Sequence, residues 1–435
     1  MPGFELAKLS KKIFESNLKV EGLVLLNHGI FTFGNSAKQS YDRMIKYVTI
    51  AEKYISNSFK KAIRKNKIKE PININLIISL IRKKIHKLNK NKWIINYSNK
   101  KNIQKFCERS DINKLLTKGP VTPDHVIRIK PKPLILDLNI LSNFSKLEFK
   151  LNKAIDNYVL NYKKYFKRNK FLVSNSIISD TIPRIIVLPP FGYLSLGRNY
   201  KETIISKDIF DSMIESLQDA HKIGSFKSIS EKETFKMEYW PLERAKLNNQ
   251  TRNILTGNIV IVTGGAGTIG SAIAKKFLSA EANVVILDND LSFKNKSFKE
   301  IYEKCLSIKC DLTNEKSIKS AIAQILTKYG GIDILISNAG RAYQGKIYNV
   351  NEDIIRKSYE INFYSHQKIA QQVIEIMKMQ DFGGNISFNL SKQSINPGNN
   401  FGPYGLPKSS TLFLMKQYAL ECGKFNIKIN GINAD

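Results

Sequence analysis

The sequence contains few cysteines, few acidic residues relative to basic ones, and no long hydrophobic run. Its four cysteines, Cys107, Cys305, Cys310 and Cys422, have neither metal-ligand nor disulfide spacing, which is typical of a protein of the reducing cytoplasm. No stretch approaches the roughly 18 apolar residues that a membrane helix needs. The first residues lack the basic-then-apolar layout of a signal peptide. We therefore expect a cytoplasmic protein with no membrane partner.

What the sequence does contain is enough apolar material for a folded core. Hydrophobic residues make up 42% of the 435 positions and aromatic residues 10%, which is typical of globular proteins and not of disordered ones. A chain of this length has room for two or three domains.

The charge is strongly positive, with a formal net charge of +32. From Asn57 to Lys118 there are 18 lysines or arginines against three acidic residues, which raises the possibility of a nucleic-acid partner. However, the whole chain has 57 lysines and only 12 arginines. Proteins that read nucleic acids rely on arginine for bidentate contacts, and none of their motifs is present. A solvated lysine surface is therefore the favoured interpretation, and a nucleic-acid binder the weaker alternative.

The pattern along the chain predicts an α/β protein with two domains. An incomplete first domain is expected over residues 1–245, a polar linker over 246–255, and a domain with alternating strands and helices over 256–435. Within the first domain, Leu26–Lys38 aligns without gaps with Pro189–Lys201. This predicts a strand hairpin followed by a helix, used twice, around residues 24–50 and 187–220. Two similar hairpins by chance are the alternative.

The second domain opens with a strand, a glycine-rich turn and a helix. The apolar run 257–262 predicts a buried parallel strand, and the helix is expected from residue 271. Backbone N–H groups at such a helix N-terminus bind a pyrophosphate, so this turn predicts a dinucleotide site. A second strand ends at Asp288, whose carboxylate would accept the ribose hydroxyls and repel a 2′-phosphate; NAD is therefore favoured over NADP. The residues expected around the pyrophosphate are Thr263, Gly264, Gly267, Thr268, Ile269 and Gly270.

These motifs resemble the short-chain dehydrogenase/reductase family, whose turn reads Thr-Gly-x-x-x-Gly-x-Gly. Thr268 stands where the family has its middle glycine; its β-carbon either weakens cofactor binding or its hydroxyl adds a hydrogen bond, and both alternatives stay open. The resemblance implies that the nicotinamide-side ribose lies near the segment Asn338, Ala339 and Gly340. It also implies that Asp311 and Leu312 contact the adenine.

Tyr404 and Lys408 are four residues apart, so on a helix they share one face. A neighbouring ammonium favours the phenolate, which can take a proton from an alcohol while a hydride leaves. Ser391, thirteen residues earlier, would hydrogen-bond the substrate oxygen, and the resemblance adds Asn362 as the fourth member of the set. Pro407 is tolerated only in the first turn of a helix, so the helix is expected to begin near Pro403 or Tyr404.

The first domain carries one isolated candidate metal ligand, His28. The segment around it resembles the third zinc-ligand segment of class II aldolases of the fuculose- and rhamnulose-phosphate type. Three ligands are needed to polarise a carbonyl, and no His-x-His pair precedes His28. Zinc is therefore expected only if the missing ligands were present, and His28 is either a vestigial ligand or a turn histidine.

Segments across the chain resemble bifunctional proteins of the rhamnulose-1-phosphate aldolase/lactaldehyde dehydrogenase type. The most specific are Met237–Glu243 and Asn399–Lys408, supported by Gly119–Arg128. The resemblance implies a Rossmann-like doubly wound sheet behind a class II aldolase-like domain, a hydroxyaldehyde or sugar-phosphate substrate, and a homo-oligomer. Compared with that family, the chain is expected to be truncated at both ends. A catalytically inactive fragment is the alternative to an NAD-dependent dehydrogenase.

Overall fold

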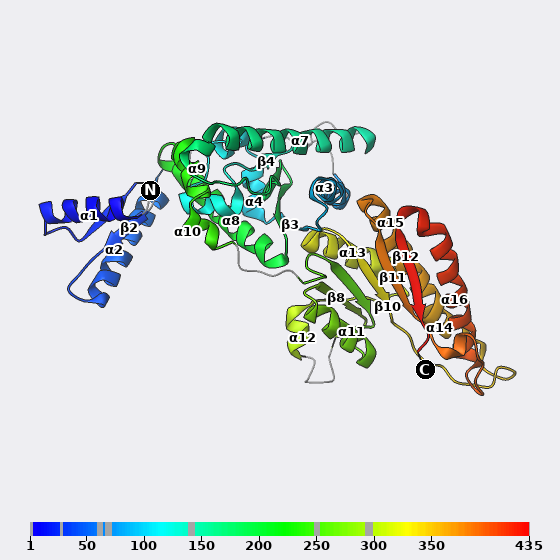
Figure 1. Cartoon of the computed structure of the whole chain (residues 1–435). Helices are drawn as coiled ribbons and strands as arrows, with labels where there is room; N and C mark the ends of the chain where they lie inside the picture. The colour runs from blue at the N-terminus through cyan, green and yellow to red at the C-terminus, as the bar shows by residue number, and fades with distance from the viewer. Residues whose placement is uncertain are drawn as a thin grey trace. The chain divides into compact units, whose positions relative to one another are not determined.

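The structure is a computed structural model that describes residues 3–26, 29–58, 64–65, 72–137, 144–247, 253–291 and 299–434 (Figure 1). The described strands form three sheets. Their orders are β1-β2, β3-β6-β5-β4 and β12-β11-β10-β7-β8-β9. Among the described residues, no helix is long and apolar enough to cross a membrane.

The chain divides into two compact units, and each unit is discontinuous in sequence. The first consists of Met1–Glu70, Ser98–Ser195 and Ile204–Gln250, and the second of Pro71–Tyr97, Leu196–Thr203 and Thr251–Asp435. A boundary at residues 246–255, as the sequence suggests, assigns 71–97 and 196–203 to the first domain. Their contacts assign them to the second unit.

The first unit begins with a hairpin between two helices. Helix α1 (Phe4–Ser16) precedes strands β1 (Gly22–Leu25) and β2 (Gly29–Thr32), which pair antiparallel, and α2 (Ala37–Asn57) follows. The Ser36 side chain accepts a hydrogen bond from the Gln39 N–H and so caps α2.

The rest of the first unit combines helices with a short sheet. Its helices are α4 (Lys101–Cys107), α5 (Ile112–Leu116), α6 (Val126–Ile129), α7 (Phe144–Asn169), α8 (Tyr200–Ile223), α9 (Glu231–Glu238) and α10 (Pro241–Ala245). Its strands are β4 (Leu134–Ile135), β5 (Ile185–Leu188) and β6 (Gly192–Gly197). The end of β6 and the first residues of α8 belong to the second unit. Strands β5 and β6 pair antiparallel ahead of α8, so a hairpin followed by a helix occurs in both copies of the suggested repeat. Common origin of the two copies stays a prediction.

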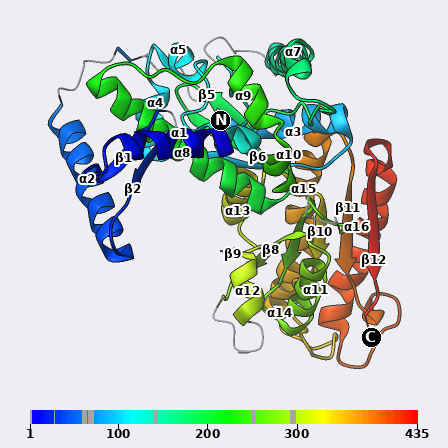
Figure 2. The ribbon, with the colours of Figure 1, turned by 60° about the vertical axis from the view of Figure 1, so that its left-hand side comes forward.

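The second unit is built on a six-stranded parallel sheet, which confirms the expected Rossmann-like α/β fold (Figure 2). Its strands are β7 (Ile259–Thr263), β8 (Asn283–Asp288), β9 (Leu306–Lys309), β10 (Ile334–Ser337), β11 (Gly384–Asn389) and β12 (Ile427–Ile432). The chain runs outward from β7 to β9 and then returns to β10 on the other side of β7. Ligands bind parallel sheets of this kind at the carboxyl ends of the strands, where the order reverses.

Helices cover both faces of this sheet. They are α11 (Thr268–Ser279), α12 (Lys299–Lys304), α13 (Glu315–Tyr329), α14 (Glu352–Tyr359), α15 (Ser365–Gln380) and α16 (Gly402–Cys422). Alternate residues of β7 enter two cores, because successive side chains on a strand point to opposite faces. Ile259 and Ile261 pack with α13 and α15, whereas Val260 and Val262 pack with α11.

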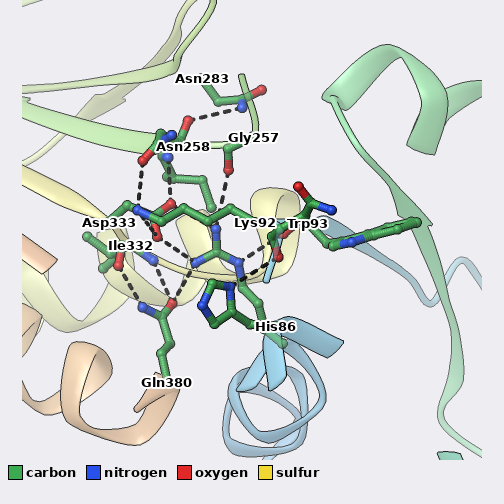
Figure 3. A network of polar contacts seen from close by, with 12 residues as sticks. His86, Lys92, Trp93, Gly257, Asn258, Asn283, Ile332, Asp333 and Gln380 are labelled. Carbon is green, nitrogen blue, oxygen red and sulfur yellow. Dashed lines mark hydrogen bonds and ion pairs between the residues drawn. The ribbon is translucent and has the colours of Figure 1, made fainter. Parts of the chain in front are cut away.

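Helix α3 (Ile74–Asn89) and strand β3 (Ile94–Ser98) complete the second unit. Helix α3 packs on α13 and α15, and its Arg82 is 1% exposed. The Arg82 guanidinium pairs with the buried Asp333 carboxylate at 2.8 and 3.1 Å and also donates to Gln380 at 2.9 Å (Figure 3). Asp333 in turn accepts the Ile259 N–H at the start of β7.

The same guanidinium reaches two backbone carbonyls. Its Nε donates to Trp93 O at 2.9 Å and its Nη2 donates to Gly257 O at 3.3 Å (Figure 3). One side chain therefore joins α3, the residues before β3, the residues before β7, and the end of α15. This network accounts for the assignment of residues 71–97 to the second unit.

Candidate active site

The glycine turn follows β7, as the sequence predicts, and ends in α11. Gly264 has a φ of +62°, and a β-carbon there would lie 2.9 Å from Ala339 Cα. At Gly270 a β-carbon would collide with Gly264 O at 2.2 Å, so both positions require glycine. Gly267 is different, because a β-carbon there would meet only Gly264 O, at 3.4 Å. Its open side leaves room for a ligand next to the N-terminus of α11.

Thr268 and Ile269 form the first turn of α11, and both line the cavity described below. The first N–H groups of a helix have no partner within the helix, so this turn presents donors to an anion. Thr268 is exposed. Thr268 lines the cavity in this first turn of α11, where a phosphate would bind. Weaker cofactor binding through its β-carbon and an added hydrogen bond through its hydroxyl therefore both stay predictions.

Asp288 ends β8 beside the glycine turn. Its Oδ2 accepts the Ala266 N–H at 3.0 Å and its Oδ1 accepts the Asp290 N–H at 3.2 Å. These bonds hold the carboxylate at the mouth of the turn. Asp311 and Leu312 follow β9, the neighbouring strand; Asp311 is fixed by Thr313, whose N–H donates to its Oδ1 at 2.9 Å.

Thr263 fastens the end of β7 to the end of β10. It is fully buried, and its hydroxyl oxygen accepts the N–H groups of Asn338 at 2.8 Å and of Ala339 at 3.0 Å. The Asn338 amide then donates to Thr263 O at 3.0 Å. Gly340 follows, and a β-carbon there would lie 3.0 Å from Asn362 Oδ1 and 3.6 Å from Lys408 Nζ.

Tyr404 and Lys408 lie on α16, with the Lys408 ammonium 5.8 Å from the Tyr404 ring centre. Lys408 is 2% exposed and donates to Asn389 O at 2.9 Å; burial lowers its pKa to about 8. The pKa of Tyr404 is raised, because the effect of burial exceeds the lowering effect of a hydrogen bond with Ser391. Ser391 therefore adjoins the phenol, at the start of the turn after β11.

Helix α16 begins at Gly402, one residue before the expected start. Pro407 lies inside the helix beyond the first turn, which corrects the expectation that a proline here must lie within that turn. Because proline has no N–H, the Pro403 carbonyl lacks its usual partner four residues on. The pair Tyr404 and Lys408 still shares one face across this defect.

Asn362 lies in a π-helical turn, Glu360–Tyr364, between α14 and α15. Such turns are rare and recur at functional sites. The Asn362 side chain accepts the Arg341 N–H at 3.1 Å and donates to Arg341 O at 2.9 Å, and Thr411 on α16 donates to Asn362 O at 2.7 Å. It thus joins the segment after β10 to the helix that carries Tyr404 and Lys408.

A cavity of about 600 Å³ connects these groups. Thirteen of the predicted residues line it: Gly264, Gly267, Thr268, Ile269, Gly270, Asp288, Asp311, Leu312, Asn338, Ala339, Gly340, Tyr404 and Lys408. Thr263, Ser391 and Asn362 lie behind the lining and support it.

Sequence reasoning missed eight residues that line this cavity, and two of them, Asn389 and Arg341, bond to predicted site residues. Asn389 ends β11. Its carbonyl accepts the hydrogen bond from Lys408, and its side-chain amide donates to Asn338 Oδ1 at 2.8 Å. Asn389 lies at the carboxyl end of a strand, near the place where the strand order reverses. Ligands bind at such strand ends, so this position could have indicated a site residue. Arg341 directly follows Asn338-Ala339-Gly340, but nothing in the sequence showed that its backbone is held by Asn362.

The metal prediction falls outside the described part of the chain, because His28 is not among the described residues. Within the described ranges, no group of three or more His, Cys, Asp or Glu side chains could hold a metal ion. The described residues therefore do not fit a zinc site, and we derive no chemical step through zinc.

Comparison with known families finds two matches along the chain. Residues 73–247 match the family model "Aldolase class II, second domain" and residues 258–434 match "short chain dehydrogenase". One relative, "Dehydrogenase/reductase SDR family member 4" of Oryctolagus cuniculus, is 30% identical over 41% of this chain and 70% of its own length. The chain belongs to the short-chain dehydrogenases. The part that matches this family follows the residues that match the aldolase class II model, which confirms the expected two-part architecture.

Another relative is "Uncharacterized oxidoreductase YuxG" of Bacillus subtilis (strain 168). It is 27% identical over 456 residues that include 100% of this chain, and the chain spans 65% of that relative's length. A solved structure, a 3-ketoacyl-(acyl-carrier-protein) reductase from Brucella melitensis complexed with NADH, is similar with a TM-score of 0.39 at 24% identity. That likeness covers 41% of this chain and 75% of the other.

Proposed function

We propose that this chain is an NAD-dependent dehydrogenase that oxidises a small alcohol or hydroxyaldehyde. The observation that carries the proposal is the single cavity that contains the glycine turn and Asp288 at one end and Tyr404 with Lys408 at the other. Its volume of about 600 Å³ lies in the usual range for sites of small ligands.

The residues present fit a dinucleotide. Gly267 leaves open space at the N-terminus of α11, where a pyrophosphate would accept backbone N–H groups. The Asp288 carboxylate, held by the Ala266 N–H, would accept ribose hydroxyls and repel a 2′-phosphate. This supports NAD over NADP.

When bound, NAD would supply the hydride acceptor. The Tyr404 phenolate would take the alcohol proton, and Ser391, hydrogen-bonded to the phenol, would orient the substrate oxygen. Lys408 would stabilise the phenolate through its ammonium and would also hold the nicotinamide-side ribose. Asn362 would fix the backbone of Arg341 at the catalytic end of the cavity.

The aldolase class II match over residues 73–247 supports a more specific form of this proposal. An aldol cleavage releases a hydroxyaldehyde, which is a substrate that the dehydrogenase site can oxidise. The sequence resemblance to the rhamnulose-1-phosphate aldolase/lactaldehyde dehydrogenase type makes small hydroxyaldehydes such as lactaldehyde the first compounds to test.

The test is NADH formation by the whole chain with a panel of small alcohols and hydroxyaldehydes. Replacement Tyr404→Phe removes the base and keeps the ring, so we expect kcat to fall by at least 100-fold while the Kd for NAD stays within about twofold. Tyr348→Phe, at an exposed tyrosine that does not line the cavity, is the matched control. NAD binding without turnover of any compound by the unmodified chain would favour a non-catalytic role.

A further inference from the structure

The dinucleotide cavity carries opposite charges on its two sides. Among its described lining residues, the carboxylates Asp288 and Asp311 follow strands β8 and β9. The cations are Arg341, after β10, and Lys408, on α16 beside Tyr404. In the sheet, β8 and β9 lie on one side of β7 and β10 lies on the other. The glycine turn after β7 therefore separates a side with carboxylates from a side with cations, and the reacting phenol is on the cationic side.

The two cations differ in what the proposed reaction does with them. The Lys408 ammonium donates to Asn389 O at 2.9 Å and lies 5.8 Å from the Tyr404 ring centre, so its charge acts on the phenol. Arg341 has no such task. In the described part of the chain, no carboxylate pairs with its guanidinium. A positive charge at the reacting end is thus left for a ligand.

The backbone that carries Arg341 is held at both ends of a short loop. The Asn362 side chain accepts the Arg341 N–H at 3.1 Å and donates to the Arg341 carbonyl at 2.9 Å. Further along, the Gly345 N–H donates at 2.8 Å to a carbonyl of the loop before α16. Gly340 directly precedes Arg341, and a β-carbon on it would lie 3.6 Å from Lys408 Nζ. The Arg341 side chain therefore starts from a fixed place close to the reacting groups.

An aromatic ring supports the guanidinium of Arg341. The guanidinium carbon lies 5.4 Å from the Tyr343 ring centre, within the range of a cation–π contact. Stacking on a ring uses the face of the planar guanidinium and leaves the N–H groups at its edge for an acceptor. A carboxylate can accept two parallel bonds from this edge. The exposed Arg341 side chain therefore suits a planar anion.

We propose that the dehydrogenase site takes alcohols that carry a carboxylate, namely small 2- or 3-hydroxy acids, and that Arg341 binds this carboxylate. The inference rests on the proposed dehydrogenase function and names its substrate class. Arg341 selects the substrate through charge and two-point geometry, whereas Ser391 and Tyr404 act on the hydroxyl group.

The carboxylate takes no part in the bonds that change. The C–H bond at the carbinol carbon breaks, and its electron pair leaves as a hydride to NAD, which is reduced to NADH. The O–H proton passes to the Tyr404 phenolate, and the hydroxy acid becomes a keto acid. Because the carboxylate keeps its charge throughout, Arg341 binds the substrate and the transition state alike. Its loss should therefore raise KM and change kcat little.

The experiment uses the whole chain with NAD and pairs of compounds that differ in one group. The pairs are lactate with propane-1,2-diol, and 3-hydroxybutyrate with butane-1,3-diol. A charge-assisted contact predicts that kcat/KM is at least about tenfold higher for the acid in one pair or both. Arg341→Gln should remove this preference by raising KM for the acid, with kcat and the Kd for NAD within about twofold. Lys346→Gln removes a charge from an exposed position of the same loop that does not line the cavity, and should keep the preference.

Calorimetry supplies a second readout that does not depend on turnover. With Tyr404→Phe saturated with NAD, we expect the preferred acid to bind and the added Arg341→Gln to weaken this binding at least about tenfold. Equal kcat/KM for acids and diols, or no binding of either acid in this titration, would overturn the proposal. So would weaker NAD binding as the sole effect of Arg341→Gln, because it would place the guanidinium on the cofactor. Failure of the unmodified chain to bind NAD would overturn the dehydrogenase function itself, and this inference with it.

Discussion

At the scale of single residues, Asp288 determines the expected choice of cofactor. Asp288→Ala removes the charge that a 2′-phosphate would meet, so we expect affinity for NADP to rise about tenfold or more and affinity for NAD to fall. Fluorescence titration with both nucleotides measures the ratio. Asp290→Ala, two residues further and outside the cavity lining, should not change it. An unchanged ratio in the Asp288 variant would place the ribose elsewhere.

Lys408 illustrates the cost of placing a charge in a site. Burial lowers its pKa from 10.5 to about 8, so between these values the unfolded chain binds a proton that the folded chain does not. The contribution of Lys408 to the free energy of unfolding therefore becomes more favourable as the pH rises from 8 to 10.5.

Lys408→Met should accordingly be more stable than the unmodified chain below pH 8, by about 1–3 kcal/mol, and should lose this advantage toward pH 10.5. Denaturant titrations of both proteins at several pH values measure the difference. A constant difference across this range would show that the Lys408 ammonium is not penalised by burial.

At the scale of elements, α3 is joined to the sheet by a buried ion pair. Arg82→Met removes the guanidinium paired with the buried Asp333 carboxylate and leaves it the Lys92 ammonium at 3.5 Å, so we expect the free energy of unfolding to fall by about 3 kcal/mol. Urea denaturation measures this change. Arg356→Met breaks the Arg356–Glu352 pair, in which both side chains are more than 70% exposed, and should cost less than about 1 kcal/mol. Equal costs would mean that the Arg82 network contributes little.

The glycine turn and the helix α16 were predictable because their signals are local. A buried strand, a turn with Gly264 and Gly270, and a helix lie within about twenty consecutive residues, and Tyr404 and Lys408 are one helical turn apart. The π-helical turn at Asn362 was not predictable, since its bonds to Arg341 and Thr411 depend on packing of separate elements. The prediction that Pro407 lies in the first turn of its helix was wrong. Local propensity disfavours proline inside a helix, but packing of the buried Pro407 within α16 overrides that preference.

At the scale of the whole molecule, the second unit is built from separate segments of the chain, which the sequence did not reveal. Arg82 and Asp333 are 251 positions apart, and a charged residue in a lysine-rich segment gives no sign of which carboxylate it will meet. The excess of basic residues around α3 suggested a solvated surface, whereas Arg82 is buried and α3 packs on α13 and α15.

A cleavage experiment tests whether α3 belongs to the second unit. If a site for a specific protease is inserted after Leu247 and the chain is cut, we expect the two pieces to elute together on size exclusion under native conditions. The reason is that residues 72–97 of the first piece remain packed on the second. Adding Arg82→Met should make the pieces separate more readily. Separation of the pieces without that substitution would mean that α3 is not a permanent part of the second unit.

The split origin of the second unit also sets an order of events during synthesis. Ribosomes add about 5–20 residues per second, so α3 leaves the ribosome roughly 10–50 seconds before the strand that begins next to Asp333. During that interval the Arg82 charge has no Asp333 carboxylate to pair with, and α3 has no α15 to pack against. The nascent chain must keep this helix from aggregating, and a translation pause or a chaperone in that window would act on α3 before any other part of the second unit.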